Sequence, residues 1–190
     1  MSTFDNMTDM EVIELCLKDN KYFEIIVNRY KNLVFSVVQK MVSDTETSKD
    51  LSQEIFIKIY KNLYKYSTEY KFATWIIKIS TNHVIDYRRK QHIATVEFDS
   101  NMHDNIKVLS AEEECIKKER TLELERLISS LPDEFRIPIV LYHREGLSYQ
   151  EISNILEIPL SKVKNRIFKG RKLLKELVES ASVRGDLYEL

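Results

Sequence analysis

The stretch LSYQEISNILEIPLSKVKNRIFKGRKLL, residues 147–174, decides the fold. Ser148 and Glu151 have the spacing of a capping box, in which each side chain accepts from the other residue's backbone N–H, so a helix should begin after Ser148. Pro159 disfavours the helical conformation in the residue before it and should end this helix, and Ser161 can cap the next one. The stretch therefore predicts two short helices joined by a tight turn.

The second of these helices carries unopposed positive charge. Its buried side is expected to consist of Val163, Ile167, Leu173, Leu174 and Leu177. Its cations are Lys162, Lys164, Arg166, Lys169, Arg171, Lys172 and Lys175, with no acidic residue among them. A basic run alone usually marks a solvated helix. Two tight helices, a proline-marked turn and this charge together are typical of a helix-turn-helix that enters the major groove of DNA.

The composition favours an all-α protein. Only three glycines and three prolines occur in 190 residues, too few for the turns of an all-β fold or for a glycine-rich phosphate loop. The length and a hydrophobic content of 43% allow one or two domains. A formal net charge of -1 hides an asymmetry, because cations collect at residues 88–90 and after residue 162 while acidic residues collect at 97–114.

Cysteine and histidine usage predicts no metal, no cofactor and no catalytic residue. Cys16 and Cys115 are far apart without a CxxC spacing, so reduced thiols are expected. The histidines are scattered, and no acidic ligand cluster or nucleophile with its base is evident, so the chain is not expected to be an enzyme. The acidic N-terminus lacks a signal-peptide pattern, and no window approaches 18 apolar residues, which predicts a cytoplasmic protein.

Apolar residues at helical spacing predict helices through the first half of the chain. Thr8 and Glu11 form another capping box, so a helix should begin there and run to about residue 18. Its buried side is expected to consist of Met10, Ile13 and Leu17. A second stripe extends over residues 23–41. A third consists of Leu51, Ile55, Ile59 and Leu63, while Asp50, Gln53, Glu54 and Lys61 share another face that by itself indicates only a solvated surface.

A further helix is expected over residues 72–90, after a loop at 65–71 whose aromatic, cationic and hydroxyl side chains can stack on and bond to exposed bases. Its core side should be formed by Phe72, Trp75, Ile76, Ile79, His83 and Tyr87. Thr74, Lys78, Asn82 and Asp86 recur at four-residue spacing on another side. His83 is interpreted as a core or boundary residue rather than a ligand, and the terminal Arg88, Arg89 and Lys90 also suit the helix dipole.

The acidic, aperiodic segment 93–114 is interpreted as a flexible linker between two small helical domains. About 22 extended residues span up to about 70 Å, so two modules could act at separate points. Helical spacing resumes beyond the linker, and Gly146 should close the helix before Ser148. The predicted boundaries are 1–92 for the first domain, 115–180 for the second, and 181–190 for a tail.

From Tyr22 to Val178 the chain resembles the bacterial extracytoplasmic-function (ECF) RNA polymerase sigma factors, which keep only sigma domains 2 and 4. The resemblance rests on DLSQEIF at 50–56, FATWIIKISTNHVIDYRRK at 72–90, and the segment 131–174, which includes the two predicted helices at 147–174. It implies an alternative sigma factor for regulated transcription such as a stress response. The core polymerase, through its β′ clamp helices and β subunit, and promoter DNA are the implied partners.

The resemblance also implies roles for individual residues. Positions matching Asp50, Gln53 and Glu54 would dock on the β′ clamp helices. Those matching Tyr66, Lys71, Lys78, Asn82, Arg88 and Arg89 would hold the opened -10 strand. Those matching Lys162, Lys164, Asn165, Arg166, Phe168, Lys169 and Arg171 would contact the -35 element, with Arg166 and Arg171 on phosphates. An anti-sigma factor, possibly membrane-anchored in this family, is a further implied partner.

Two positions depart from the family pattern. Glu157 stands where the family often has glycine in the turn, and Lys162 where it often has threonine, so the -35 preference cannot be transferred. A non-glycine residue with positive φ costs about 1 kcal/mol, so a slightly distorted turn is expected. The alternative interpretation is a helix-turn-helix transcriptional regulator that does not join polymerase. A dimer on symmetric half-sites would distinguish it.

Overall fold

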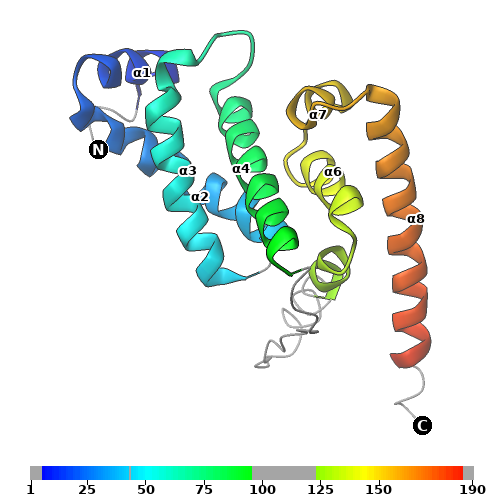
Figure 1. Cartoon of the computed structure of the whole chain (residues 1–190). Coiled ribbons are helices and arrows are strands. Elements are labelled where there is room, and N and C mark those ends of the chain that lie inside the picture. The colour runs from blue at the N-terminus through cyan, green and yellow to red at the C-terminus, as the bar shows by residue number, and fades with distance from the viewer. Residues whose placement is uncertain (1–5, 43, 96–122, 186–190) are drawn as a thin grey trace. The chain divides into compact units, whose positions relative to one another are not determined.

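The computed structural model describes residues 6–42, 44–95 and 123–185, with side chains described up to Gln91 and from residue 123 to Ser180 (Figure 1). Every regular element in these ranges is helical, in agreement with the expected all-α class. Residues 1–87 and 88–190 form two compact units. Most of the predicted linker at 93–114 lies outside the described residues.

The first unit is built from helices that follow one another closely. They are α1 (Asp9–Lys18), the 3₁₀ turn η1 (Asn20–Tyr22), α2 (Phe23–Val42), α3 (Thr45–Asn62), the 3₁₀ turn η2 (Leu63–Lys65) and α4 (Phe72–Thr95), which continues past the division between the units. Thr8 and Glu11 form the expected capping box at the start of α1. Asp44 caps α3 by accepting from the backbone N–H of Thr47.

The core of this unit lies between α2, α3 and α4. The stripe predicted on α3 is confirmed, since Leu51, Ile55, Ile59 and Leu63 are all buried. They pack with Val34, Val37, Val38 and Met41 of α2 and with Ile76 and Val84 of α4, which are all fully buried. Each such side chain contributes about 1.5–3 kcal/mol by leaving water. The polar side of α3 is thereby fixed toward solvent.

The structure corrects the predicted buried side of α1. The buried residues are Val12, Ile13 and Cys16, whereas Met10 and Leu17 are exposed. Both sets have helical spacing, so periodicity could not choose between them. Asp9 lies on the buried side, where its Oδ2 accepts from the Tyr30 hydroxyl of α2 at 2.6 Å, and this bond fixes the rotation of the helix.

The structure also corrects the faces of α4. Trp75, Ile79 and Tyr87 are only half-buried, and the buried positions include Thr74, Ile77, Ser80, Thr81 and Val84. Residues spaced by four advance about 400° around the axis, so such a row drifts by about 40° at each step. Thr74 therefore faces the core while Asn82 and Asp86 are half-exposed. The hydroxyl of Ser80 donates to the Ile76 carbonyl at 2.9 Å, so it can be buried without a partner on another helix.

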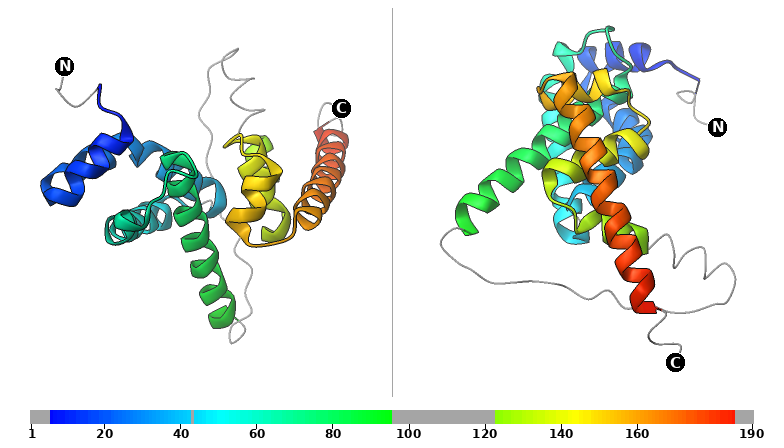
Figure 2. Two further views of the ribbon diagram at one scale, coloured as in Figure 1. Left: turned by 90° about the horizontal axis from the view of Figure 1, so that it is seen from above. Right: turned by 90° about the vertical axis from the view of Figure 1, so that its right-hand side faces the viewer.

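The second unit contains a helical segment at 123–129, then α6 (Asp133–His143), α7 (Tyr149–Leu156) and α8 (Leu160–Gly185). Figure 2 shows α8 as one long helix with α7 at its N-terminal end. Its core is made of Leu131, Ile137, Ile139, Val140, Leu141, Leu147, Ile152, Ile155, Val163 and Ile167. The helix-turn-helix expected from the sequence is therefore present as α7 and α8. The first residues of the predicted tail continue α8 to Gly185.

The turn between α7 and α8 has a left-handed cap. The Ser148–Glu151 capping box is present, and Gly146 before it has φ +68°. Glu157 adopts φ 53° and ψ 40°, and its N–H donates to the Ser153 carbonyl, so the turn keeps ordinary left-handed geometry despite the missing glycine. Contrary to expectation, Ser161 does not precede the second helix. The helix begins at Leu160, directly after Pro159, whose carbonyl accepts from the backbone N–H of Val163 at 3.1 Å.

The packing of α8 on α6 depends on Gly170. A Cβ atom at this position would lie 2.5 Å from Ile139 Cδ1 and 3.1 Å from Phe135 Cβ. Beyond Gly170 the contact loosens, since Leu173, Leu174 and Leu177, predicted to be buried, are only half-buried. Only the first half of α8 therefore packs closely against the core of the second unit.

Candidate functional site

The outer face of α8 is a row of exposed side chains. Its members are Lys162, Lys164, Asn165, Phe168, Lys169 and Arg171, which are all exposed. Phe168 stands among these cations with 70% of its surface exposed, an arrangement that a purely structural helix would not need. Within the described part of the chain, Lys162, Lys164 and Lys169 form no ion pair, whereas Lys172 and Lys175 pair with glutamates one turn further along.

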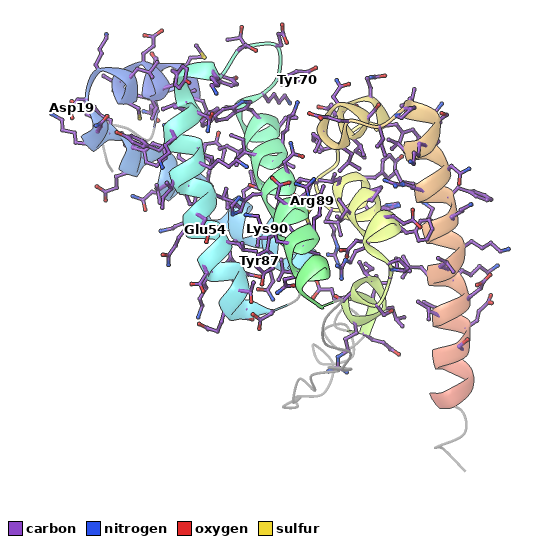
Figure 3. All side chains as sticks on the ribbon, viewed as in Figure 1. Asp19, Glu54, Tyr70, Tyr87, Arg89 and Lys90 are labelled. Atoms are coloured by element: carbon purple, nitrogen blue, oxygen red, sulfur yellow. The ribbon has the colours of Figure 1, made fainter. Side chains whose placement is uncertain are left out.

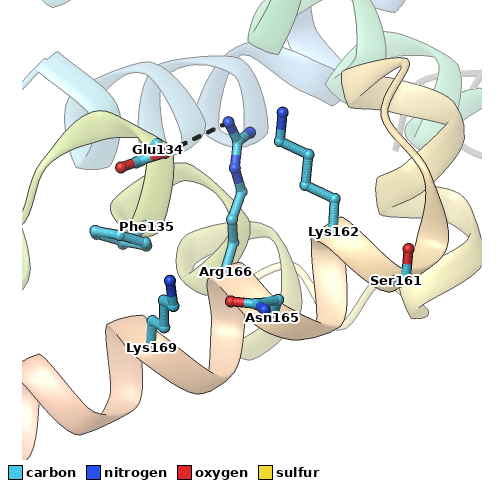
Figure 4. A pocket seen from close by; sticks show the side chains of 7 residues that line it. All are labelled: Glu134, Phe135, Ser161, Lys162, Asn165, Arg166 and Lys169. Carbon is cyan, nitrogen blue, oxygen red and sulfur yellow. Dashed lines mark ion pairs between the residues drawn. The ribbon is translucent and has the colours of Figure 1, made fainter.

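Arg166 differs from the other cations of α8. Its side chain is only 22% exposed, and its Nη2 lies 3.6 Å from Oε2 of Glu134 in the first turn of α6. Together with Lys162 and Lys169 these residues line an open hollow of about 430 Å³ (Figure 4). The sequence pattern did not indicate Glu134, because this acidic group comes close to α8 only through the packing of α6.

Arg171 is held by aromatic residues of α6. Its Nε donates to Nε2 of His143 at 3.1 Å, and its guanidinium lies 5.3 Å from the ring centre of Tyr142. Tyr142 in turn stacks on Tyr149 at the start of α7. Burial, and secondarily the charge of Arg171, lower the pKa of His143, which suits the neutral imidazole that this hydrogen bond requires. The arrangement orients Arg171 along the side of α8.

The polar face of α3 is exposed as the sequence predicted. Asp50, Gln53 and Glu54 all reach solvent (Figure 3 labels Glu54). The same face includes Ile57, a large apolar residue that is 55% exposed, and Tyr64 in the following turn η2 is 67% exposed. The spacing of three residues between Glu54 and Ile57 was the available signal for Ile57, whereas Tyr64 lies beyond the end of α3.

Glu54 contacts α4 through a side chain 29 residues away. The imidazole Nε2 of His83 lies 2.9 Å from Glu54 Oε2. Because an ionised carboxylate only accepts, Nε2 of His83 carries the hydrogen. The side chain of His83 is 19% exposed and that of Glu54 is 61% exposed, so the bond lies at the edge of the core. His83 is thus a boundary residue, as expected from the sequence.

The loop between η2 and α4 is organised around Tyr66. Its hydroxyl donates to the Tyr70 carbonyl at 2.8 Å, and its ring packs edge-on against Phe72 and Trp75. Burial raises the pKa of the Tyr66 hydroxyl. Tyr70 and Lys71 are exposed instead. Of the two tyrosines, Tyr70 is the more exposed, whereas the resemblance singled out Tyr66.

The cations and amide of α4 do not all share one side. Lys78, Asn82 and Arg88 are half-exposed, and Arg89, which is labelled in Figure 3, is exposed. At about 100° per residue, Lys78, Asn82 and Arg89 fall within about 40° of one another, while Arg88 lies about 80° to one side of Lys78. Three of the four residues therefore form one stripe along the helix.

Neither a metal site nor a membrane span is found where the structure can be described. No group of three or more His, Cys, Asp and Glu side chains in those ranges is placed to hold a metal ion. No helix in them is both long and apolar enough to cross a bilayer.

Two regions of known proteins match the chain, one mostly within the first unit and one within the second. Sigma-70 region 2 matches residues 26–93, and Sigma-70 region 4 matches residues 121–174. The chain is 32% identical over 168 residues to the ECF RNA polymerase sigma factor SigW of Bacillus subtilis, covering 83% of this chain and 89% of that protein. It is 31% identical to the ECF RNA polymerase sigma-E factor of Escherichia coli strain K12, covering 92% of this chain and 96% of that protein. The chain belongs to the ECF RNA polymerase sigma factors.

Solved structures show the same fold. The sigma factor RpoE of Bartonella quintana, crystallised with the anti-sigma factor NepR, has a TM-score of 0.69 at 18% identity and covers 84% of this chain and 98% of its own. CnrH, in complex with the cytosolic domain of CnrY, has a TM-score of 0.63 and covers 90% of this chain and 97% of its own. As a sigma factor the chain is a transcription initiation factor that binds core RNA polymerase and not an enzyme.

Proposed function

We propose that the exposed faces described above divide the work of promoter recognition. The first domain, residues 1–92, docks on core polymerase and opens the -10 element, and the second, residues 115–180, reads the -35 element. Residues 93–114 link the two, and 181–190 form the tail. The family matches at 26–93 and 121–174 support this division.

The observation that carries the proposal is the outer face of α8. Cations without ion pairs can donate to DNA phosphates or to base edges, and the exposed ring of Phe168 suits contact with a thymine methyl group in the major groove. We assign Lys164, Asn165, Phe168 and Lys169 to base edges. We assign Lys162, Arg166 and Arg171 to the phosphate backbone of the DNA, because Arg166 and Arg171 lie at the two sides of α8 next to α6.

For the -10 element we assign the loop with Tyr66 and Lys71 and the α4 residues Lys78, Asn82, Arg88 and Arg89. Tyr66 acts by holding the loop, while the exposed Tyr70 supplies a stacking surface. A stacked base is worth about 1–3 kcal/mol, comparable with the cost of unstacking one step. Binding of captured bases can therefore open the strands without a catalytic residue.

For polymerase we assign the α3 face with Asp50, Gln53 and Glu54 to the β′ clamp helices. The exposed Ile57 continues this face and can add apolar contact area. The second domain would meet the β subunit. Such a factor acts in the cytoplasm, and an anti-sigma factor that covers these exposed faces, whether soluble or membrane-anchored, would inhibit it.

Run-off transcription with core polymerase on genomic fragments tests the proposal and identifies a preferred promoter. Phe168→Ala should weaken binding to the preferred -35 duplex by about 1–3 kcal/mol while leaving the melting temperature unchanged. Val178→Ala is the matched control, because Val178 is also an exposed apolar residue of α8 but lies almost three turns beyond Phe168. Equal effects of the two substitutions would refute the assigned face.

Asn82→Ala separates melting from duplex recognition. It should reduce open-complex formation on duplex promoter while leaving -35 binding intact, and a pre-melted template should restore part of the activity. Full activity on both templates would remove Asn82 from the -10 surface.

A further inference from the structure

Two helices of the first unit carry different proposed surfaces, and one side-chain pair joins them. The α3 face with Asp50, Gln53 and Glu54 is assigned to polymerase, and the α4 stripe with Asn82 is assigned to DNA. His83, next to Asn82 in the chain, reaches from α4 to Glu54, with 2.9 Å between Nε2 and Oε2. Neither the family-based residue assignments nor the sequence pattern gives His83 a role in binding.

The two partners are exposed to very different degrees. The imidazole is 19% exposed and the carboxylate 61% exposed, so His83 is the fixed member and Glu54 the mobile one. A glutamate on a helix surface samples several rotamers about three torsions and loses that freedom when a partner binds it. A bond to a half-buried ring selects one of these rotamers before the partner arrives.

The hydrogen bond to His83 leaves the Glu54 carboxylate with further acceptor positions for a polymerase side chain. A carboxylate has two oxygens and about four acceptor positions, and His83 uses one of them at Oε2. The remaining positions face outward on an exposed residue and can accept from a cationic or amide donor. Glu46 on the same helix pairs with Lys49, one turn away and also exposed, so that contact gives no comparable anchorage to the core.

We propose that His83 is a positioning residue for core-polymerase binding, which acts by holding Glu54 in its docking rotamer from the neighbouring helix. The proposal rests on the assignment of Glu54 to the polymerase face. His83 itself does not contact polymerase. Loss of the Nε2 donor should therefore weaken binding through Glu54 and through no other residue.

Amide side chains offer a matched pair of variants. In His83→Gln the amide nitrogen can take the place of Nε2, whereas in His83→Asn the shorter side chain places its amide near the position of Nδ1, which does not reach Glu54. The two variants have the same chemistry and differ only in reach. A positioning role predicts that His83→Gln binds core polymerase like the wild type and that His83→Asn binds about three- to ten-fold more weakly.

The experiment is a titration of full-length protein with core polymerase for the wild type, both His83 variants, Glu54→Ala, and Glu54→Ala combined with His83→Asn. Thermal unfolding of each variant, followed by fluorescence of Trp75, the single tryptophan, reports the fold of the first unit. We expect Glu54→Ala to weaken binding, and the double variant to bind no more weakly than Glu54→Ala alone. Coupling of this kind is the signature of action through Glu54.

The outcomes separate this inference from the docking assignment. Unchanged binding of Glu54→Ala would refute the docking face itself. Weak binding of Glu54→Ala with normal binding of His83→Asn would overturn only the role of His83. Additive losses in the double variant, or failure of His83→Gln to bind normally, would show that His83 acts independently of Glu54. If His83→Asn destabilises the unit, His83→Leu, which keeps apolar volume without a donor, replaces it in the same cycle.

Discussion

Replacing Gly170 by alanine should loosen the packing of α8, the helix that we assign to the -35 element, against α6. An alanine Cβ would lie 2.5 Å from Ile139 Cδ1, 3.1 Å from Phe135 Cβ and 3.3 Å from Ile139 Cγ1. The terminal methyl of Ile139 can rotate away, but the Cβ of Phe135 can move only with the backbone of α6. The two helices must therefore separate slightly or the Ile139 side chain must leave its rotamer.

The expected magnitude is the difference between two opposing effects. Forcing an extra methyl into a packed core costs about 1–3 kcal/mol. Alanine is favoured over glycine within a helix by about 1 kcal/mol, which offsets part of that cost. The net loss should be about 1 kcal/mol. In a unit of this size it corresponds to a fall in melting temperature of about 4–8 °C.

The assay uses the two units as references for each other. Far-UV circular dichroism follows the helices of both units, while Trp75, the single tryptophan, lies in the first unit. Gly170→Ala should therefore lower the temperature of the circular-dichroism transition of the second unit and leave the temperature of the fluorescence transition unchanged. Adding Ile139→Val, which deletes the closest atom, should make the double variant more stable than the sum of the single effects predicts.

Gly146 provides the contrasting case. It has φ +68°, and a Cβ atom added there would meet no other atom within 4 Å, so backbone conformation and not space restricts this position. Asparagine, which tolerates the left-handed region, should be accepted at 146 and rejected at 170. If Gly170→Ala raises the stability by about 1 kcal/mol, as at an open helix position, the close approach of α6 and α8 is wrong.

Three further predictions concern the second unit. Lys164→Ala should weaken binding by about 1–3 kcal/mol, mainly on the preferred -35 duplex. Arg171→Ala should weaken binding to preferred and scrambled duplexes alike and reduce the slope of log affinity against log salt by about one. The opposite pattern in salt titrations would reverse the assigned orientation of α8. Glu134→Gln removes the carboxylate beside Arg166 and should raise the affinity for scrambled DNA at low salt, because less negative charge faces the phosphates; unchanged affinity would place Glu134 away from the DNA. Glu157→Gly should relieve about 1 kcal/mol of left-handed strain, partly offset by greater freedom of the unfolded chain, and a lower melting temperature would contradict this.

Local signals in the sequence were sufficient for much of the fold. The capping boxes at Thr8 and Ser148 are present because they depend on residues three apart in the chain. The α3 stripe is buried as expected because Leu51, Ile55, Ile59 and Leu63 form one continuous apolar row, whereas Ile57 stands apart from it and is exposed. On α1 two overlapping stripes share Ile13, and the choice between them depends on the contact of Asp9 with α2. Periodicity shows that a face is apolar, but the neighbouring helix determines which face is covered.

The contacts that the sequence did not predict are those between residues far apart in the chain. Glu54 and His83 were each placed on a plausible face, yet nothing local indicated that they meet. The same holds for Glu134 and Arg166, which join the start of α6 to the reading helix. Charge along one helix can be read from spacing, whereas pairing across helices requires their crossing geometry.

Pro138 interrupts the backbone hydrogen bonding of α6. It is a buried residue in the middle of the eleven-residue helix, and it has no N–H to donate to the carbonyl of Glu134. One backbone hydrogen bond is therefore missing between the first turn of α6 and the rest of the helix. Val140 and Leu141 in that later part are buried in the core. The first turn is held by its side chains instead, since Arg136 and Ile137 are buried and Phe135 packs beside Gly170. The place of Glu134 at the rim of the hollow beside α8 therefore depends on this packing and not on the backbone hydrogen bond that Pro138 cannot make.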